Sequence, residues 1–395
     1  MDLTILNPEI QKFISANLAA NSTQLAFQKN PFPNVDWKEI INQIVAKQKV
    51  KDKLPSWYTT ENIFYPSKIS LEQTSSEKTA DYKASLVSGE RLIDLTGGFG
   101  VDDFYFSKKV KQVIHCEINE ELSKIVAHNF GQLKVTNCNC IIGDSTAILE
   151  DLNQKFDWIY IDPSRRNDAK VKVFMLKDCT PNVPELMDFY FKYSANIIVK
   201  TAPILDITAG LLELKNVKEV HIVAVDNEVK ELLWIIEKGY VNAIAIKTIN
   251  LFKNSMETFE TIFSEMELLV TFSLPKKYLY EPNSAIMKSG AFNAVATKYS
   301  LDKLHPNSHL YTSENLIDFP GRIFEIEKTI PYHKTEMKAA LVDKKANVTI
   351  RNFSESVENI RKKWKIKEGG NLYTFFTTDQ NDDKIVLLCS KLNKI

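Results

Sequence analysis

The feature that most limits the fold is an alternation of short apolar runs and helical segments between residues 76 and 250. Strands that alternate with helices form a parallel sheet covered by helices. The sequence therefore predicts an α/β fold whose centre is a doubly wound, mostly parallel, seven-stranded Rossmann-like sheet. The expected strands lie at 92–95, 113–116, 138–142, 158–161, 197–200, 220–225 and 243–246.

The segments on either side of this sheet have different patterns. The first has apolar residues at helical spacing, and Asp36 is a possible N-cap there. The last 140 or so residues mix expected strands, such as LLVTFSL at 268–274, with the helical segment SESVENIRKKWKI, which is an α+β pattern. We expect a helical region at 1–75, the sheet domain at 76–255, and two α+β domains at 256–322 and 323–395.

Composition excludes several classes of protein. The chain has 50 acidic and 50 basic residues, so it lacks the global positive charge of many nucleic-acid-binding proteins. Its five cysteines include no CxxC pair, which predicts reduced thiols, no metal site and a cytoplasmic location. The first residues carry no signal peptide, and no segment has the ~20 apolar residues that span a bilayer.

The first expected strand ends in LIDLTGGFGVDD, where Gly97, Gly98 and Gly100 form the turn into a helix. Glycine lets a backbone approach a ligand closely. A dinucleotide motif would need a third glycine where Asp103 stands, and acidic residues oppose a pyrophosphate at a helix N-terminus. We therefore expect a ligand that is not held by phosphates, although the glycines could simply form a tight turn.

The next three strand ends also carry polar groups. Glu117 ends the second strand, where a carboxylate can accept the hydroxyls of a ribose. Asp144 and Ser145 follow the third strand and could meet an adenine amino group. The fourth strand ends in IDPSRR, with Asp162 directly after it. Because ligands of open α/β sheets bind at the carboxyl ends of strands, these residues form one candidate site.

Together the four strand ends resemble those of class I methyltransferases that use S-adenosylmethionine. The resemblance implies that the glycine loop holds the amino acid part of the cofactor, Glu117 the ribose and Asp144 the adenine. Lys83, on an expected helix before the first strand, would pair with the cofactor carboxylate; the alternative is an ordinary outer helix. The implied cofactor residues are Lys83, Asp94, Thr96, Gly97, Gly98, Gly100, Glu117, Ile118, Asp144 and Ser145.

The same resemblance gives IDPSRR a role. Methyltransferases that modify amino groups carry an acid, a proline pair and an aromatic at this position, and the acid and a backbone carbonyl hold the target amine. Asp162 and Pro163 match that pattern, but Ser164 and Arg165 depart from it, which weakens the case for a stacked base. Arg165 and Arg166 could bind phosphate or stack on a base, or they could form a structural salt bridge. The implied catalytic segment is Asp162, Pro163, Ser164 and Arg165.

A wider resemblance covers nearly the whole chain. The segments KLPSW, TGGFGVD, IDPSRR, VDNEVKELLW and YLYEPNSAIMKSGAF are similar to a bacterial family of methyltransferase-like proteins with a ferredoxin-like segment and a THUMP-like C-terminal domain. This resemblance implies the fold and the cofactor, and through the THUMP-like domain it suggests RNA, such as rRNA or tRNA, as the partner. It supplies neither the substrate nor the oligomeric state.

Two further segments are candidate substrate contacts. Asn227 ends a strand in VDNEVKELLW and could face the same cleft or cap a neighbouring segment. Lys362, Lys363 and Trp364 lie in the basic run IRKKWKIK, which is either a phosphate-binding face with a stacking aromatic or a solvated face above a buried tryptophan. From Arg322 onward there are 15 basic and 10 acidic residues, a surplus of five that favours RNA.

Three functions remain open from the sequence. The first is an S-adenosylmethionine-dependent methyltransferase that modifies an amino or ring nitrogen of an RNA base. The second is an RNA-binding protein with a vestigial cofactor site. The third is a methyltransferase that acts on a small molecule or a protein.

Overall fold

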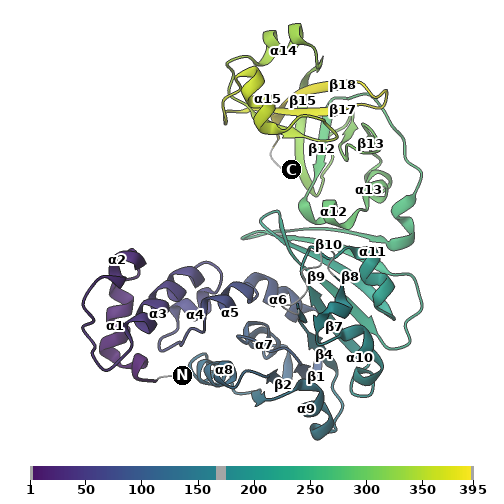
Figure 1. Ribbon diagram of the computed structural model, residues 1–395. Helices are drawn as coiled ribbons and strands as arrows, with labels where there is room; N and C mark the ends of the chain where they lie inside the picture. The colour runs from purple at the N-terminus through teal and green to yellow at the C-terminus, as the bar shows by residue number, and fades with distance from the viewer. Residues whose placement is uncertain (1–2, 166–174, 393–395) are drawn as a thin grey trace. The chain divides into compact units, whose positions relative to one another are not determined.

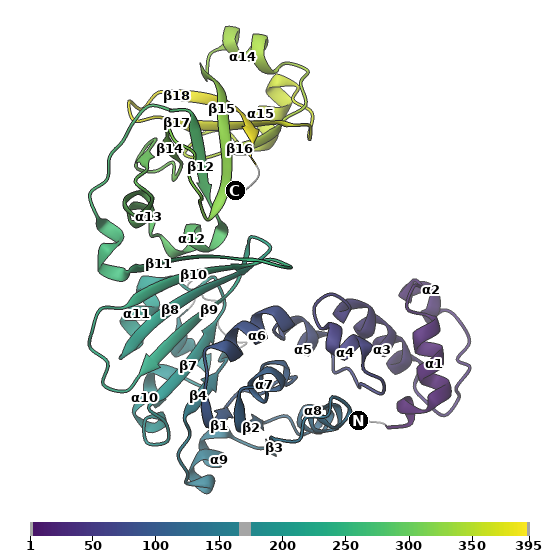
Figure 2. The ribbon, with the colours of Figure 1, turned by 180° about the vertical axis from the view of Figure 1, so that it is seen from behind.

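Residues 3–165 and 175–392 are described by a computed structural model, shown from two sides in Figures 1 and 2. By its internal contacts the chain divides into two units. The first comprises Met1–Val217 and Leu233–Val241, and the second comprises Lys218–Leu232 and Asn242–Ile395. The strand ends that carry the expected site residues at 94–117 and 144–162 lie in the first unit, and the basic run IRKKWKIK lies in the second.

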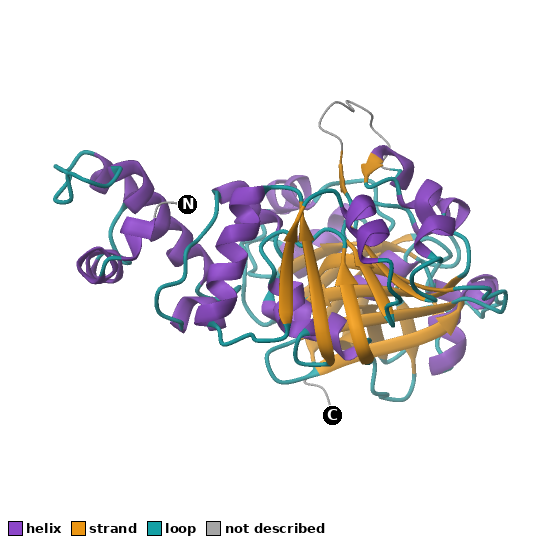
Figure 3. Cartoon of the chain, turned by 90° about the horizontal axis from the view of Figure 1, so that it is seen from below, coloured by secondary structure: helices purple, strands orange, loops and turns teal. Residues whose placement is uncertain are grey.

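The N-terminal segment consists of helices and loops, as Figure 3 shows. Asp36 caps the longest of these helices by accepting a hydrogen bond from the Lys38 N–H, as the sequence predicts. The segment packs against the sheet domain through Phe64, which exchanges two hydrogen bonds with the Asn129 side chain. The helices are α1 Pro8–Ala16, α2 Ser22–Ala26, α3 Trp37–Val50, α4 Pro55–Thr59, α5 Lys68–Gln73 and α6 Glu77–Ser85.

The central sheet has nine strands and is mixed, instead of the seven mostly parallel strands that the sequence predicts. Its strand order is β11-β10-β8-β9-β7-β4-β1-β2-β3. The expected strands are present with shifts of a few residues at their ends, and two strands, β9 and β11, were missed. The bounds are β1 Gly89–Asp94, β2 Val110–Glu117, β3 Cys138–Ile142, β4 Trp158–Ile161, β7 Asn196–Thr201, β8 Val217–Val225, β9 Glu228–Glu237, β10 Ala245–Leu251 and β11 Met256–Ile262.

The mixed character has a local cause. Asp226 and Asn227 both have positive φ angles, 49° and 64°, and together they form the two-residue loop between β8 and β9. A two-residue loop of this kind makes a hairpin, and a hairpin joins antiparallel strands. The pair β10 and β11 is also antiparallel, whereas β8 and β10, β4 and β7, and the pairs among β1 to β4 are parallel.

Helices follow the strands of the sheet domain much as the alternation predicts. Asp144 and Asn119 act as N-caps, and their side-chain oxygens accept backbone N–H groups of the helices they precede. The helices are α7 Val101–Phe106, α8 Glu120–Gln132, α9 Ser145–Leu152, α10 Val183–Tyr190 and α11 Ile207–Glu213. None of the described helices is long and apolar enough to cross a membrane.

The C-terminal part of the second unit is built on one seven-stranded sheet with the order β13-β14-β12-β15-β18-β17-β16 (Figure 2). The two expected α+β domains therefore share a sheet, because β12 pairs with β15. Its strands are β12 Tyr278–Pro282, β13 Asp302–Lys303, β14 Tyr311–Ser313, β15 Gly321–Pro331, β16 Asn347–Ile350, β17 Leu372–Thr378 and β18 Lys384–Lys391. Its helices are α12 Ser284–Ser289, α13 Phe292–Tyr299, α14 Lys334–Leu341 and α15 Val357–Trp364.

One predicted strand was wrong. Residues 268–274, LLVTFSL, form no strand, and only Phe272 makes an isolated bridge, to Lys303. Leu269 is 99% exposed, so this apolar run is not a buried strand. The apolar composition alone could not distinguish a core strand from an exposed connection.

Candidate functional site

The four polar strand ends come together at one edge of the sheet. β1 lies between β4 and β2, β3 follows β2, and all three pairings are parallel. Asp94 and Glu117 are the last residues of β1 and β2, and Asp162 directly follows β4. Parallel strands end on the same side, so the sequence-predicted site residues from these strands share one edge.

The three glycines of the loop after β1 have different roles. A Cβ on Gly97 would lie 2.2 Å from two atoms of the His115 ring, and one on Gly100 would lie 2.7 Å from Val126. These two glycines are therefore required by packing inside the fold. Gly98 has a φ of 56°, and its Cβ would meet nothing closer than the Thr96 carbonyl at 3.8 Å. Open space above a left-handed glycine leaves room for a ligand at Gly98.

Glu117 fixes this loop from the neighbouring strand. Its carboxylate accepts hydrogen bonds from the Gly98 N–H at 3.0 Å and from the Asn119 N–H at 2.7 Å. Each carboxylate oxygen has further lone pairs, so Glu117 can still accept hydroxyl groups. Ile118 beside it is 73% exposed and offers an apolar surface to a flat ring. Glu117 and Ile118 could therefore hold a ribose and the base attached to it.

Asp94 lies beneath the loop and does not face the open space. It is buried, and its Oδ1 accepts the Thr96 N–H at 2.7 Å and the Thr96 hydroxyl at 3.1 Å. Asp103 is also buried, and its Oδ2 lies 2.6 Å from His115 Nδ1. Burial raises the pKa of both Asp94 and Asp103 well above the ordinary aspartate value, and repulsion between neighbouring carboxylates adds to it. Asp94 therefore shapes the loop, and His115 is a core histidine that has Asp103 as its partner.

Lys83 occupies a place that the sequence did not predict. Its side chain is fully buried, and its Nζ lies 3.1 Å from Asp102 Oδ1 and donates to Ser75 Oγ at 2.8 Å. Asp102 also accepts the Tyr160 hydroxyl at 2.8 Å. Ser76 caps α6. In this arrangement Lys83 ties α6 to α7 and β4, which is a structural role, and its contact with the cofactor stays a prediction.

Asp144 and Ser145 stand at the start of α9. Asp144 is exposed, and its Oδ1 accepts the N–H groups of Thr146 and Ala147 at 3.0 and 3.1 Å. One carboxylate oxygen is thus used as a helix cap, and the other accepts no hydrogen bond from the described residues. This cap leaves Asp144 able to accept a further hydrogen bond, as the expected contact to adenine requires.

Asp162 is held from two sides. Its backbone N–H donates to the Thr96 hydroxyl at 2.7 Å, and its Oδ2 lies 2.7 Å from Lys200 Nζ. Lys200 stands near the end of β7, the strand that pairs with β4. The sequence gave no reason to select Lys200, because the lysine becomes a neighbour of Asp162 only through the pairing of two strands that are distant in sequence.

The rest of IDPSRR is described in part. Pro163 is buried and Ser164 is exposed. The backbone of Ser164 and Arg165 forms a short strand, β5, which pairs with β6 at Cys179–Thr180. Arg166, with which the sequence prediction continues, lies outside the described residues.

Asn227 supports the capping alternative. It sits in the β8–β9 turn, and its Oδ1 accepts the Ser284 N–H at 2.7 Å at the start of α12. Its own N–H donates to the Asn250 side chain at 2.9 Å. These bonds explain Asn227 within the second unit without a substrate.

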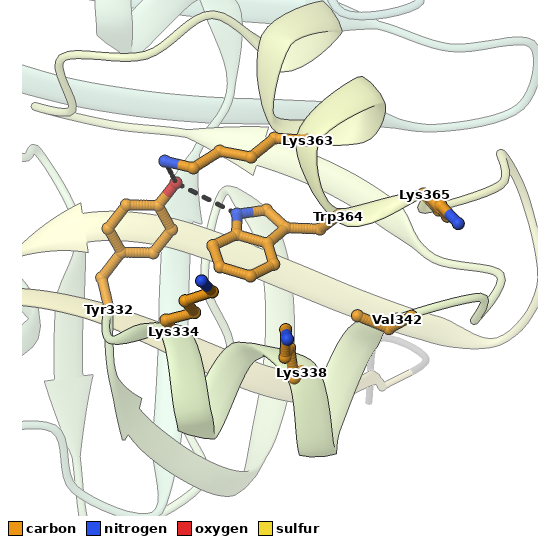
Figure 4. A pocket seen from close by; sticks show the side chains of 7 residues that line it. All are labelled: Tyr332, Lys334, Lys338, Val342, Lys363, Trp364 and Lys365. Atoms are coloured by element: carbon orange, nitrogen blue, oxygen red, sulfur yellow. Dashed lines mark hydrogen bonds between the residues drawn. The ribbon is translucent and has the colours of Figure 1, made fainter.

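The basic run of α15 borders a pocket of about 560 Å³ in the second unit (Figure 4). Trp364 is buried, with only 7% of its surface exposed, and its Nε1 donates to the Tyr332 hydroxyl at 3.1 Å. The prediction of a buried tryptophan beneath a charged face therefore describes this helix better than a stacking aromatic does. Lys363 pairs with Glu355 at 3.0 Å, and Lys362 is exposed but does not line the pocket.

Three other lysines line this pocket; Lys365 belongs to the basic run IRKKWKIK, and the sequence analysis singled out neither Lys334 nor Lys338. Lys334 and Lys338 extend from α14, one helical turn apart, and Lys365 follows α15 (Figure 4). Over residues 3–165 and 175–392 no acidic partner is recorded for these three side chains. Helical spacing of four residues at 334 and 338 could have indicated a common face, but α15 meets α14 only in the folded unit.

The thiols and acids give no sign of a metal centre in the part of the chain that the structure describes. All five cysteines are free, and no cluster of three or more histidine, cysteine, aspartate or glutamate side chains could hold an ion there.

Comparison with known proteins identifies the C-terminal segments. A family model for a ferredoxin-like domain matches residues 278–320, and a model for a THUMP domain-like region matches residues 321–391.

Two relatives cover different shares of the chain. The crystal structure of a candidate methyltransferase from Porphyromonas gingivalis W83 is 30% identical, has a TM-score of 0.88, and matches over 100% of both chains. An uncharacterised RNA methyltransferase of Clostridium acetobutylicum is 28% identical over 175 residues. That match takes in 40% of this chain and 35% of the relative, so it spans about a third of the curated relative's length.

Proposed function

Because the chain belongs to the family of class I methyltransferases with ferredoxin-like and THUMP-like C-terminal domains, we propose that it methylates RNA using S-adenosylmethionine. The acceptor in this proposal is an amino or ring nitrogen of a base. The observation that carries the proposal is the edge formed by β1, β2 and β4. There an open glycine loop, a loop-bonded glutamate and a half-buried aspartate at a strand end lie on adjacent parallel strands.

The residues at this edge fit S-adenosylmethionine. Gly98 leaves open space for its amino acid part, Glu117 has lone pairs for the ribose hydroxyls, and the exposed Ile118 can cover a face of the adenine. Asp144 would accept from the adenine amino group with the oxygen that is not used in the cap. When bound, the cofactor supplies an electrophilic methyl group on a sulfonium.

Asp162 would act on the acceptor. Its free carboxylate oxygen can accept a hydrogen bond from a target N–H and so turn the nitrogen lone pair toward the methyl carbon. Such a role needs no strong base, because catalysis comes from proximity and orientation. Arg165 and Arg166 would contact the neighbouring phosphate or base, as the sequence suggests.

The THUMP-like segment would bind the RNA through its pocket lysines. Lys334, Lys338 and Lys365 border one hollow, and they can neutralise phosphate groups of a strand (Figure 4). Lys362, which is exposed on α15, would add a further positive charge for RNA. The clustering of these cations in a neutral chain supports RNA over a small-molecule or protein substrate.

The experiment that tests the function is methyl transfer by wild-type protein and the Asp162→Ala variant. Tritiated S-adenosylmethionine is incubated with unmodified transfer and ribosomal RNA made by transcription in vitro. We expect the wild type to label one of these RNAs. We expect the variant to bind the cofactor normally and to lose about two orders of magnitude or more in activity, because misplacement of a reactant can reduce the rate by that much. Full activity of the variant would remove Asp162 from the mechanism.

A further inference from the structure

We propose that Lys200 is a positioning residue that holds the Asp162 carboxylate toward the methyl acceptor, a role that rests on the proposed function. β4 and β7 are parallel neighbours, and their last common pair is Ile161 with Val199. Asp162 directly follows Ile161, and Lys200 directly follows Val199, so the two residues come next in this register. Lys200 Nζ lies 2.7 Å from Asp162 Oδ2.

The two members of the pair differ in exposure. The Lys200 side chain is 14% exposed and the Asp162 side chain is 34% exposed. The ammonium thus lies deeper at the strand ends, and the carboxylate lies nearer to solvent, where a substrate would arrive. With Oδ2 bound to the ammonium, Oδ1 is the oxygen that remains for an acceptor N–H.

The backbone of Asp162 is fixed by a second contact. Its N–H donates to the Thr96 hydroxyl at 2.7 Å, and that hydroxyl donates to Asp94 Oδ1 at 3.1 Å. Thr96 belongs to the glycine loop, so the loop that would hold the cofactor and the residue that would hold the acceptor share one chain of hydrogen bonds. Because a hydroxyl can both accept and donate, the Thr96 side chain makes both bonds at once.

Orientation is what such a site must supply. An aspartate at the end of a strand can rotate about two side-chain bonds, and rotation would turn its free oxygen away from the acceptor. A charge-assisted hydrogen bond to one oxygen restricts this rotation. Because a displacement of about 1 Å can reduce a positioned reaction by roughly 100-fold, the ion pair should influence rate far more than stability. Partly exposed ion pairs contribute little to stability.

The test compares Lys200→Met and Lys200→Arg with a matched control. Lys111→Met removes another strand-borne ion pair of the same unit, Lys111 with Glu90 at 2.8 Å, at the opposite ends of β1 and β2. For each variant the turnover number, the Michaelis constant for RNA, the dissociation constant of S-adenosylhomocysteine and the melting temperature are measured. The RNA probe is the mixture of unmodified transcripts used for the wild type.

We expect Lys200→Met to reduce the turnover number by about 100-fold, while cofactor affinity changes by less than about twofold. The turnover number of Lys200→Arg should be at least about tenfold higher than that of Lys200→Met. Lys111→Met should behave as the wild type. In the Asp162→Ala background, Lys200→Met should cause no further decrease, because Lys200 acts through Asp162.

Two results would overturn the role while leaving the proposed function intact. The first is that the wild type methylates RNA and the Lys200→Met variant has the same turnover number. The second is that Lys200→Met reduces the turnover number by the same factor in the Asp162→Ala background as in the wild type. A wild type that binds cofactor but labels none of the RNAs would instead overturn the proposed function, and the positioning role with it.

Discussion

At the scale of single residues, the chemistry of the candidate site depends on what lies beneath the glycine loop. The ring of His115 fills the space next to Gly97, and Asp103 holds that ring in place at 2.6 Å. The sequence could identify the loop, because glycines and a strand-end acid are visible in it. It could not assign separate roles to Gly97, Gly98 and Gly100, since those depend on neighbours from other strands and helices.

Substitution of Gly97 by alanine should destabilise the protein by about 1–3 kcal/mol, because a Cβ there would overlap an imidazole that cannot move freely. The matched control is Gly131→Ala in α8, where a Cβ meets no atom within 4 Å. That control should be neutral or stabilising by up to about 1 kcal/mol. Denaturant unfolding measures both, and equal effects would contradict the packing argument.

The buried carboxyls Asp94 and Asp103 make stability depend on pH. Burial raises the pKa of both groups in the folded state, so the folded protein retains protons that the unfolded chain releases. Their contribution to stability is therefore fully present below the ordinary aspartate pKa of about 3.9, and it is lost as pH rises through the raised folded values.

Asp103→Asn removes one of these titrations and the repulsion that it exerts on Asp94. We expect its melting temperature to fall less than that of the wild type when the pH is raised from 5 to 8 at constant ionic strength. The other titrating groups are common to both proteins and cancel in the comparison. If the melting temperatures of the two proteins changed in parallel with pH, Asp103 would not titrate in this range.

At the scale of elements, short sequence patterns correctly predicted those features that depend only on neighbouring residues. The N-cap Asp36 and the four strands that build the site follow from periodicity and capping residues. The hairpin of β8 and β9 was missed because Asp226 and Asn227 form its turn without glycine, although both adopt positive φ. The predicted strand at 268–274 failed because hydrophobicity does not reveal whether a partner strand exists.

The packing of α14 beside α15 leads to a prediction about RNA binding. Replacing Lys334 and Lys338 together by alanine should weaken RNA binding and reduce the slope of log K against log salt by about 1.4 for a single strand. Lys328→Ala with Lys391→Ala removes two exposed charges of the same unit that do not line the pocket. Fluorescence anisotropy with a labelled RNA transcript, from about 50 to 200 mM salt, compares the two variants. Equal slopes would mean that the pocket does not bind phosphate.

At the scale of the whole molecule, the sequence predicted an α/β class and strand-end residues that meet at one edge of the sheet. The structure has an α/β sheet and brings these strand ends together, while their role in binding stays a prediction. The sheet is larger and less parallel than expected, because the strands after β7 add antiparallel pairs that the alternation rule does not foresee. The C-terminal strands join into one sheet across the boundary between the ferredoxin-like and THUMP-like matches. Such long-range pairings are set by the folded chain, and short windows of sequence cannot reveal them.

The central claim is that the loop after β1 and Glu117 bind S-adenosylmethionine, and calorimetric titration tests it most directly. S-adenosylmethionine and S-adenosylhomocysteine are titrated into the wild type, Glu117→Ala and the control Glu120→Ala, whose substituted side chain is exposed on α8. Circular dichroism first establishes that all three proteins are folded. We predict micromolar binding by the wild type and the control, and its loss in Glu117→Ala. A folded wild type that binds neither compound, or a Glu117→Ala variant that binds as the wild type does, would contradict the account.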